Sequence, residues 1–156
     1  MKRIKNYKNI TNILLIGGLF VVLMAIRFYE NYFYDPLLSY FKSDYLHQSM
    51  PKLLTGKLLF HLFLRYAINT LLSLLIIWIA FRKKSFIKFS FYFYTIAFFL
   101  LIITFWLVLQ THFENSYLFG FYVRRFLIQP IFVLLLLPAF YYQLKSKPKD
   151  NYSKLQ

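Results

Sequence analysis

The sequence predicts an all-α, polytopic integral membrane protein with four transmembrane helices and a short interfacial helix in the first outer loop. Of its 156 residues, 60% are hydrophobic, more than a soluble domain of this length can usually bury. Four apolar runs each approach the roughly 20 residues that a helix needs to cross a bilayer. Helices are expected because lipid offers no hydrogen-bond partner to a free backbone N–H or C=O group.

The apolar runs define the expected spans, which in chain order cover residues 10–26, 58–81, 89–110 and 119–142. They predict one transmembrane domain over residues 1–144 and a disordered cytoplasmic tail over 145–156. A cleaved signal peptide is an alternative for the first run, which follows a basic start. That run ends at Arg27 without the small-x-small pattern of a cleavage site, so an uncleaved helix is favoured. Pro130 and Pro138 should kink the fourth helix.

The distribution of charge predicts the orientation of the chain. The net charge is +14, from 19 basic and five acidic residues. Twelve basic residues fall on one side of a four-span topology, in three short segments: Lys2, Arg3, Lys5, Lys8, Arg82, Lys83, Lys84, Lys88, Lys145, Lys147, Lys149 and Lys154. The loops of the other side hold Lys42, Lys52 and Lys57. By the positive-inside rule, both termini are expected in the cytoplasm.

The first outer loop, residues 27–57, carries its own helix signal. Asp35-Pro36 is typical of a helix start, with a capping residue followed by proline at the first helical position. Apolar and polar residues then mix over the next ten positions. This pattern indicates a short helix lying in the membrane interface.

Four arginines lie within or at the edge of the expected spans, all in the outer half: Arg27, Arg65, Arg124 and Arg125. Burying an arginine in a membrane costs at least a few kcal/mol, so these residues are functional-site candidates. In the second span, a polar residue recurs every four positions and forms one stripe: His61, Arg65, Asn69 and Ser73. The second and fourth spans should therefore meet each other or a partner. The third span has no charge and should face lipid.

The candidate cluster, which is either partner-binding or structural, comprises Arg27, Glu30, Asp35, His61, Arg65, Asn69, Arg124, Arg125 and Gln129. In the structural interpretation, the arginines pair with acids of the same layer: Glu30, Asp35, Asp44 and Glu114. In the functional interpretation, they dock a partner membrane protein or an anionic group at the outer face. A third interpretation is that they snorkel to the interface without a specific partner. Adjacent residues point about 100° apart on a helix. We expect Arg125, aligned with Gln129, to turn inward and Arg124 to be left for an outside partner.

Signals for an enzyme are poor. The chain has no cysteine, and His47, His61 and His112 lack the spacing of metal ligands. It has neither a nucleophile elbow nor a glycine-rich phosphate loop. No catalytic residue, cofactor or metal is therefore expected, although His61 before Arg65 keeps a membrane-embedded enzyme as a third hypothesis. The basic segments are too short and scattered for a nucleic-acid interface, so the bilayer is the expected surrounding partner.

Several strings of residues resemble the exosortase F system-associated membrane protein family. They are Arg27-Phe28-Tyr29-Glu30, Tyr34-Asp35-Pro36-Leu37-Leu38, Lys42-Ser43-Asp44-Tyr45-Leu46-His47, Arg65-Tyr66-Ala67-Ile68-Asn69-Thr70 and Phe121-Tyr122-Val123-Arg124-Arg125-Phe126-Leu127-Ile128-Gln129-Pro130. The resemblance covers most of the chain, from the first span to Gln143. It implies a small bacterial inner-membrane protein encoded beside an exosortase, a polytopic enzyme thought to process sorting signals of exported proteins.

The resemblance implies an accessory role and no catalytic residues. The leading hypothesis is a non-enzymatic accessory subunit of an exosortase-type protein-sorting system, which docks a partner through the arginines of the outer half. The alternative is a small transporter or channel subunit for an anionic solute. An anion path needs polar residues through the whole span, whereas the helices beyond Ser73 and Gln129 are almost entirely apolar. That favours the accessory hypothesis.

Overall fold

The computed structural model describes residues 2–29, 32–42, 53–111 and 117–146. Of these residues 89% are helical, and no strand occurs among them. The tail expected to be disordered lies outside the described residues from position 147 onward. Three helices are long and apolar enough to cross a membrane, and a fourth span results if one bent helix pair is counted as one. The prediction of an all-helical chain with such spans is confirmed.

Three of the expected spans are single, continuous helices. Helix α1 covers Lys2–Phe28, α3 covers Thr55–Phe81 and α4 covers Lys84–Gln110. Each begins before the apolar run that predicted it, because its polar first turns continue the helix beyond the apolar part. Arg82 follows α3 as its C-cap, and its left-handed backbone (φ 51°, ψ 29°) turns the chain toward α4.

The fourth expected span is broken. Helix α5 covers Tyr117–Ile128 and α6 covers Ile131–Lys145, and the two are bent by 65°. Pro130 lies at the break, as expected for a residue that lacks an N–H and constrains the one before it. Pro138 lies inside α6, which continues past it. A break of this angle also fits a re-entrant segment, so the number of spans is three or four.

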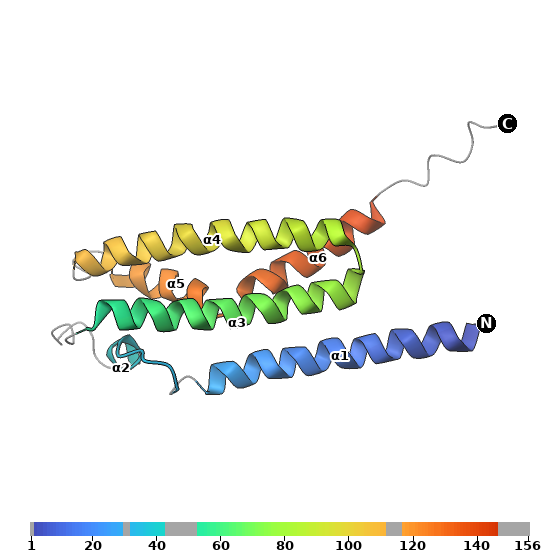
Figure 1. Cartoon of the computed structure of the whole chain (residues 1–156), viewed down its shortest axis with the longest axis horizontal. Helices are drawn as coiled ribbons and strands as arrows, with labels where there is room; N and C mark the ends of the chain where they lie inside the picture. The colour runs from blue at the N-terminus through green and yellow to red at the C-terminus, as the bar shows by residue number, and fades with distance from the viewer. Residues whose placement is uncertain (1, 30–31, 43–52, 112–116, 147–156) are drawn as a thin grey trace.

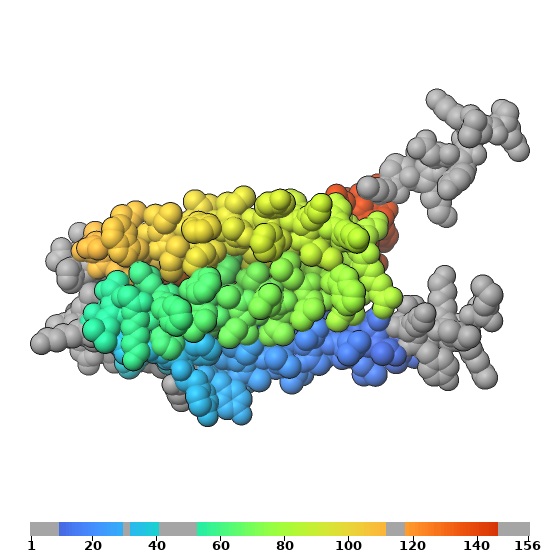
Figure 2. All heavy atoms as spheres, in the orientation of Figure 1, coloured from blue at the N-terminus to red at the C-terminus, as the bar shows by residue number. Residues whose placement is uncertain are grey.

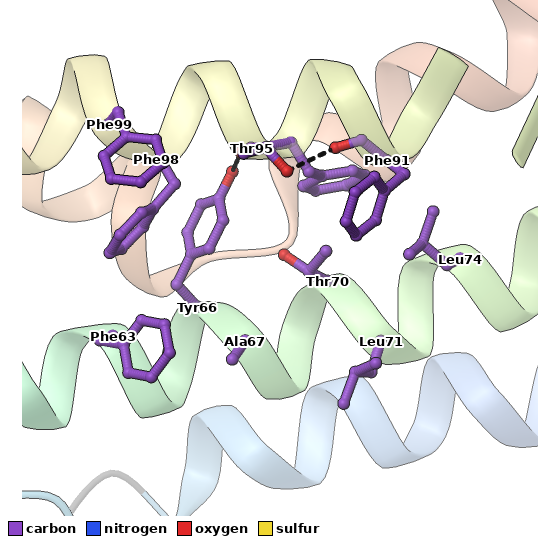
Figure 3. A pocket seen from close by; sticks show the side chains of 11 residues that line it. Phe63, Tyr66, Ala67, Thr70, Leu71, Leu74, Phe91, Thr95, Phe98 and Phe99 are labelled. Atoms are coloured by element: carbon purple, nitrogen blue, oxygen red, sulfur yellow. Dashed lines mark hydrogen bonds between the residues drawn. The ribbon is translucent and has the colours of Figure 1, made fainter. Parts of the chain in front are cut away.

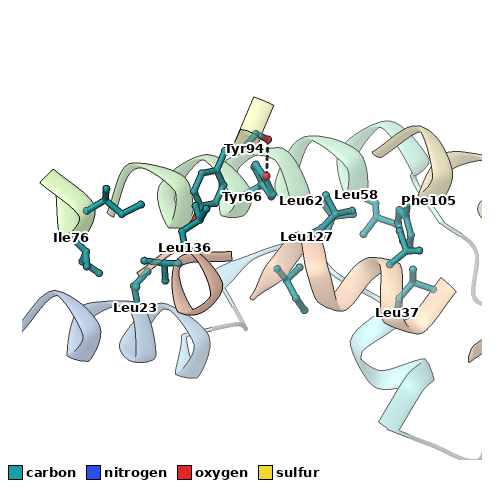
Figure 4. Close-up of a cluster of buried hydrophobic side chains, with 14 of the residues drawn as sticks. Leu23, Leu37, Leu58, Leu62, Tyr66, Ile76, Tyr94, Phe105, Leu127 and Leu136 are labelled. Carbon is teal, nitrogen blue, oxygen red and sulfur yellow. Dashed lines mark hydrogen bonds between the residues drawn. The ribbon is translucent and has the colours of Figure 1, made fainter. Parts of the chain in front are cut away.

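Helix α3 is the centre of the bundle. It contacts α1, α4, α5 and α6, and it lies between α1 and α4 on the face seen in Figures 1 and 2. The buried core follows it from end to end, and Figure 4 shows Leu58, Leu62, Tyr66 and Ile76 of α3 meeting side chains of the other helices. In the half near Arg82, the rings of Phe86 and Phe140 stack with centroids 4.4 Å apart.

Helix α1, rather than α4, is the helix most open to its surroundings. In the most apolar stretch of each helix, 6% of α1 is buried, against 22% of α4 and 39% of α3. The expectation that the third span faces lipid is therefore only partly right. Helix α4 packs on both α3 and α5, since its aromatic side chains fill the core as well as the surface.

Large apolar side chains cover the outside of the long helices. Leu14 of α1 is 71% exposed and Leu135 of α6 is 60% exposed. A soluble monomer rarely leaves so continuous an apolar surface open to water. The exposed surface therefore supports the interpretation that these helices lie in a membrane.

The short helix α2, Leu37–Lys42, occurs between α1 and α3, where the sequence predicts a short helix. It begins two residues after Asp35, whose backbone carbonyl accepts from the N–H of Leu38 at 3.1 Å. Leu37 is fully buried and anchors α2 to the bundle. In Figure 1, α2 lies at the end of the bundle where α3 begins.

Candidate functional site

The polar stripe of the second span faces the interior of the bundle. Arg65, Asn69 and Ser73 are buried to 5% exposure or less, and His61 is half-buried. Helix α3 meets α5 on this side, so the expectation that the second and fourth spans meet is confirmed. The stripe lies where four-residue spacing places it, on one face of the helix.

Asn69 links α3 to the break in the fourth span. Its Nδ2 donates to the carbonyl oxygen of Ile128 at 3.0 Å. Ile128 is the last residue of α5, where carbonyl groups lose their partners within the helix. The side chain of Ser73 donates to the Asn69 carbonyl at 2.6 Å. Asn69 therefore satisfies a backbone group that the helix break leaves open.

The ion pair of Asp35 and Arg124 joins the segment between α1 and α2 to α5. The Arg124 Nε lies 3.2 Å and 3.1 Å from the two carboxylate oxygens of Asp35, and Nη2 also donates to Oδ2. Both side chains are 4% exposed. We predict that Arg65 and at least one of Arg124 and Arg125 pair with one of the four acids or with Asn69 or Gln129, and this is confirmed for Arg124. For Arg65 it stays a prediction.

The expected positions of the Arg124 and Arg125 side chains are reversed. Arg124 is buried at 3% exposure, whereas Arg125 is exposed. The Nε of Arg125 donates to Oε1 of Gln129 at 3.1 Å, on the outside of the helix. The prediction that Arg125 turns inward with Gln129 is therefore wrong. Four-residue spacing places these two side chains on one face, but the buried face of α5 is set by Val123 and Leu127, next to Arg124.

Aromatic rings surround the cations at the start of α3. The guanidinium of Arg65 lies 5.4 Å from the ring centroid of Phe33, and Nζ of Lys57 lies 4.7 Å from that of Tyr34. The His61 ring contacts both aromatic rings. Such cation–π contacts stabilise a charge that is partly removed from water. The sequence places Arg65 and His61 in the candidate cluster, but it does not predict their contacts with the rings of Phe33 and Tyr34 or the contact of Lys57 with Tyr34.

The rest of the candidate cluster is not brought together. Arg27 lies exposed in the last turn of α1. Glu30, Asp44 and Glu114 lie outside the described residues, so their predicted pairing stays a prediction. Asp35 is the one acidic side chain within the described ranges.

One exposed face of α5 combines a charge with apolar and aromatic side chains. Leu118, Tyr122 and Arg125 lie within about 60° of each other around the helix axis, at 100° per residue. Gln129 directly follows the helix, and its backbone N–H still bonds the Arg125 carbonyl at 3.0 Å. Leu118 is 62% exposed and Tyr122 is 52% exposed. We call these four residues the Arg125 face. It points away from the buried face that carries Arg124.

The Arg125 face lies near the middle of the bundle axis. The Asn69–Ile128 hydrogen bond sets the level of the helix break. Asn69 is about 21 Å from the start of α3 and about 18 Å from its end, at 1.5 Å per residue. Arg125 is one turn from Ile128 toward the Thr55 end. In a bilayer spanned by α3, its Cα would lie about 5 Å from the midplane.

A second polar link, between α3 and α4, was not expected from the sequence. The Tyr66 hydroxyl donates to the backbone carbonyl of Tyr94 at 2.8 Å. It borders an apolar cavity of about 380 Å³ between these helices, shown in Figure 3 with Phe63, Thr70 and Phe98 among its lining residues. The signal that the sequence offered is the position of Tyr66 directly after Arg65, on the helix face next to the polar stripe. The side chain is buried there.

Within the described ranges, no three His, Asp or Glu side chains gather closely enough to hold a metal ion. The fold and the site together define an all-helical chain of three or four candidate membrane spans. A buried ion pair joins the segment before α2 to α5, and an exposed arginine lies next to it on the broken helix. Comparison with protein-family models, curated proteins and solved structures finds no match.

Proposed function

We propose that this chain is a non-enzymatic accessory subunit of the bacterial inner membrane, with both termini in the cytoplasm, and that it docks a partner membrane protein through the Arg125 face. One observation carries the proposal. Arg125 is exposed on an apolar helix near mid-depth, and its side chain is held outward by Gln129.

The cost of leaving Arg125 in lipid supports a partner. An arginine near the centre of a bilayer costs about 2.5–3.5 kcal/mol on insertion scales. Its guanidinium has five N–H donors, and Gln129 Oε1 accepts from the one on Nε. A carboxylate on a partner helix would accept from others with bidentate geometry. The neighbouring Tyr122 ring would supply rigid, amphipathic contact area.

The resemblance to the exosortase F system-associated family suggests the identity of the partner. An exosortase is a polytopic membrane enzyme, so it can present a transmembrane helix to the Arg125 face. The buried Asp35–Arg124 pair supports a division of roles between the two adjacent arginines. It uses the neighbouring arginine within the fold and leaves Arg125 to face outward.

An anion transporter subunit is the second candidate, because helices broken at mid-depth are common in transporters. The other half of the bundle argues against it. Beyond Ser73, the core is filled by apolar side chains, including Ile76, Val133 and Phe140, all 5% exposed or less. An anion passing Arg125 would meet no continuous polar path among these residues.

The proposal is tested by affinity purification in mild detergent with an exosortase as the measured prey. Arg125→Leu should lower exosortase recovery by about tenfold or more, because a hydrogen bond to a charged group contributes about 1.5–3 kcal/mol. Arg125→Lys should retain an intermediate amount, since it keeps the charge but loses the planar guanidinium fork. Protein abundance should stay close to that of the wild type.

Lys88→Leu is the matched control, because Lys88 is exposed in the first turns of α4, on a different helix from the Arg125 face. It should leave recovery unchanged. The docking proposal fails if exosortase recovery does not depend on Arg125. Anion uptake into vesicles that is lost in Arg125→Leu would instead support the transporter.

A further inference from the structure

A cavity of about 540 Å³ lies beside the last turn of α3, far from the Arg125 face. It is bounded by α1, α3 and α6, with Asn12, Ile16, Ala80, Phe81, Pro138 and Tyr141 among its lining residues. The volume is within the range of small-molecule binding sites, about 300–1,000 Å³. Its lining is mainly apolar, and Asn12 supplies an amide group.

A guanidinium is fixed beside this cavity. The Nη2 of Arg82 donates to Oδ1 of Asn12 at 3.2 Å, which connects the end of α3 to α1. Arg82 has a left-handed backbone (φ 51°), and its N–H bonds the Trp78 carbonyl at 2.8 Å. Glycine is the usual residue at such a helix end. Here the position instead brings a charged side chain to Asn12, which lines the cavity.

The charge around the cavity is of one sign. Arg82 and Lys83 connect α3 to α4, Lys84 begins α4, and all three are exposed. Lys145 ends α6, whose C-terminal end lies at the same end of the bundle in Figure 1. Among the described residues the only acid is Asp35, which is paired with Arg124 of α5. The cations therefore attract an anionic group.

An anionic amphiphile fits this combination of an apolar cavity and cationic surroundings. A soluble anion would leave the apolar lining unused, and a neutral lipid would leave the cations unused. Basic pockets between transmembrane helices are a known form of site for acidic lipid headgroups. Tyr141 is 64% exposed, so its ring can lie at the headgroup level, as interfacial tyrosines do.

We propose that this cavity binds an anionic phospholipid, with an acyl chain between α1 and α6 and the headgroup phosphate against Arg82. The cations alone are already explained by their role in topology and would attract acidic lipid diffusely. The cavity adds a defined site. One phospholipid per chain should bind, in a manner that depends on particular residues instead of total charge.

Native mass spectrometry of the full-length protein in detergent can count the bound lipids. With phosphatidylglycerol added, the wild type should retain one lipid per chain. The fraction of chains with a bound lipid should be at least tenfold larger than with phosphatidylcholine. Arg82→Asn should reduce this preference about tenfold, because a charge-assisted hydrogen bond to phosphate is lost. Asparagine is chosen because it tolerates the left-handed backbone of this position.

Two further variants separate the defined site from diffuse attraction. Lys88→Asn removes an equal charge from the first turns of α4, away from the residues that line the cavity, and should keep the bound lipid. Ala80→Trp keeps every charge, fills the cavity and should release the lipid. Ala80→Leu serves the same purpose if the larger side chain prevents folding. Lipid retention is compared only among variants whose circular dichroism spectrum shows the helix content of the wild type.

Three results would overturn the proposal. Equal losses in Arg82→Asn and Lys88→Asn would indicate diffuse attraction. Equal retention of phosphatidylcholine and phosphatidylglycerol by the wild type would remove the role of the cations. Full competition by glycerol phosphate, without any acyl chain, would reduce the site to one for a free phosphate group.

Discussion

The carboxylate of Asp35 accepts hydrogen bonds from Nε and Nη2 of Arg124, a residue 89 positions later in the chain. Both side chains are almost fully buried, at 4% exposure. The pair therefore fixes the segment before α2 against α5. It leaves the adjacent Arg125 on the outside, where a partner can reach it.

Breaking this pair on one side should destabilise the fold strongly. Arg124→Leu should lower the free energy of unfolding by about 3–5 kcal/mol, because it leaves a buried carboxylate without its counter-charge. Thermal unfolding in detergent and abundance in the membrane both report the effect. Arg125→Leu is the matched control and should change stability by less than about 1 kcal/mol, since its side chain is exposed.

The double variant Asp35→Leu with Arg124→Leu tests the cause of that loss. Replacing both charges by apolar side chains is often neutral or stabilising, so much of the stability should return. If the double variant loses the sum of the two single losses, the pairing is not what stabilises the contact between α5 and the segment before α2.

Asn69→Leu should weaken the contact between α3 and the broken helix. The carbonyl of Ile128 would lose its 3.0 Å hydrogen bond and stay buried, at a cost of about 1–3 kcal/mol. Thr104→Val is the control, because the Thr104 hydroxyl donates to Leu100 in its own helix. Unfolding in denaturant compares the two variants, and equal stabilities would contradict a capping role for Asn69.

Tyr66→Phe should remove the link between α3 and α4 at small cost. The lost hydroxyl donates to the Tyr94 carbonyl, and a bond of this kind contributes about 1 kcal/mol. Tyr92→Phe removes an equal hydroxyl from a side chain that is 65% exposed, so its thermal unfolding should match the wild type. Indistinguishable midpoints for both variants would refute the contribution of the Tyr66 link.

Reporter fusions test the predicted orientation. Fusions at Lys8, Lys84 and Lys149 should all report the cytoplasm, and one at Lys52 should report the periplasm, because the basic segments are expected to stay inside. A periplasmic signal at Lys149 would show that α5 and α6 form a re-entrant segment, leaving three spans.

The helices followed from the sequence because apolar length and loop charge are local properties. The stripe of Arg65, Asn69 and Ser73 was also predictable, since four-residue spacing fixes one helix face. The reversal of Arg124 and Arg125 was not. Spacing tells which side chains share a face, but packing against other helices decides which face is buried.

The residues that pair over long sequence distances in the site were likewise not predictable from the sequence. Arg124 had several possible acids, and the choice of Asp35 depends on where the first outer loop folds back. Asn69 was a candidate from its place in the stripe. Its acceptor is a carbonyl freed by the helix break, and this break depends on Pro130 and on the packing around it.

Site-specific photo-crosslinking in intact membranes tests docking most directly. A photoreactive phenylalanine analogue at Tyr122 lies on the Arg125 face, and the same analogue at Ile96, 60% exposed on α4, is the control. Docking predicts an adduct between this chain and an exosortase from position 122, which is absent from position 96 and reduced by Arg125→Leu. Lipid adducts alone at position 122, or equal protein adducts at both positions, would contradict it.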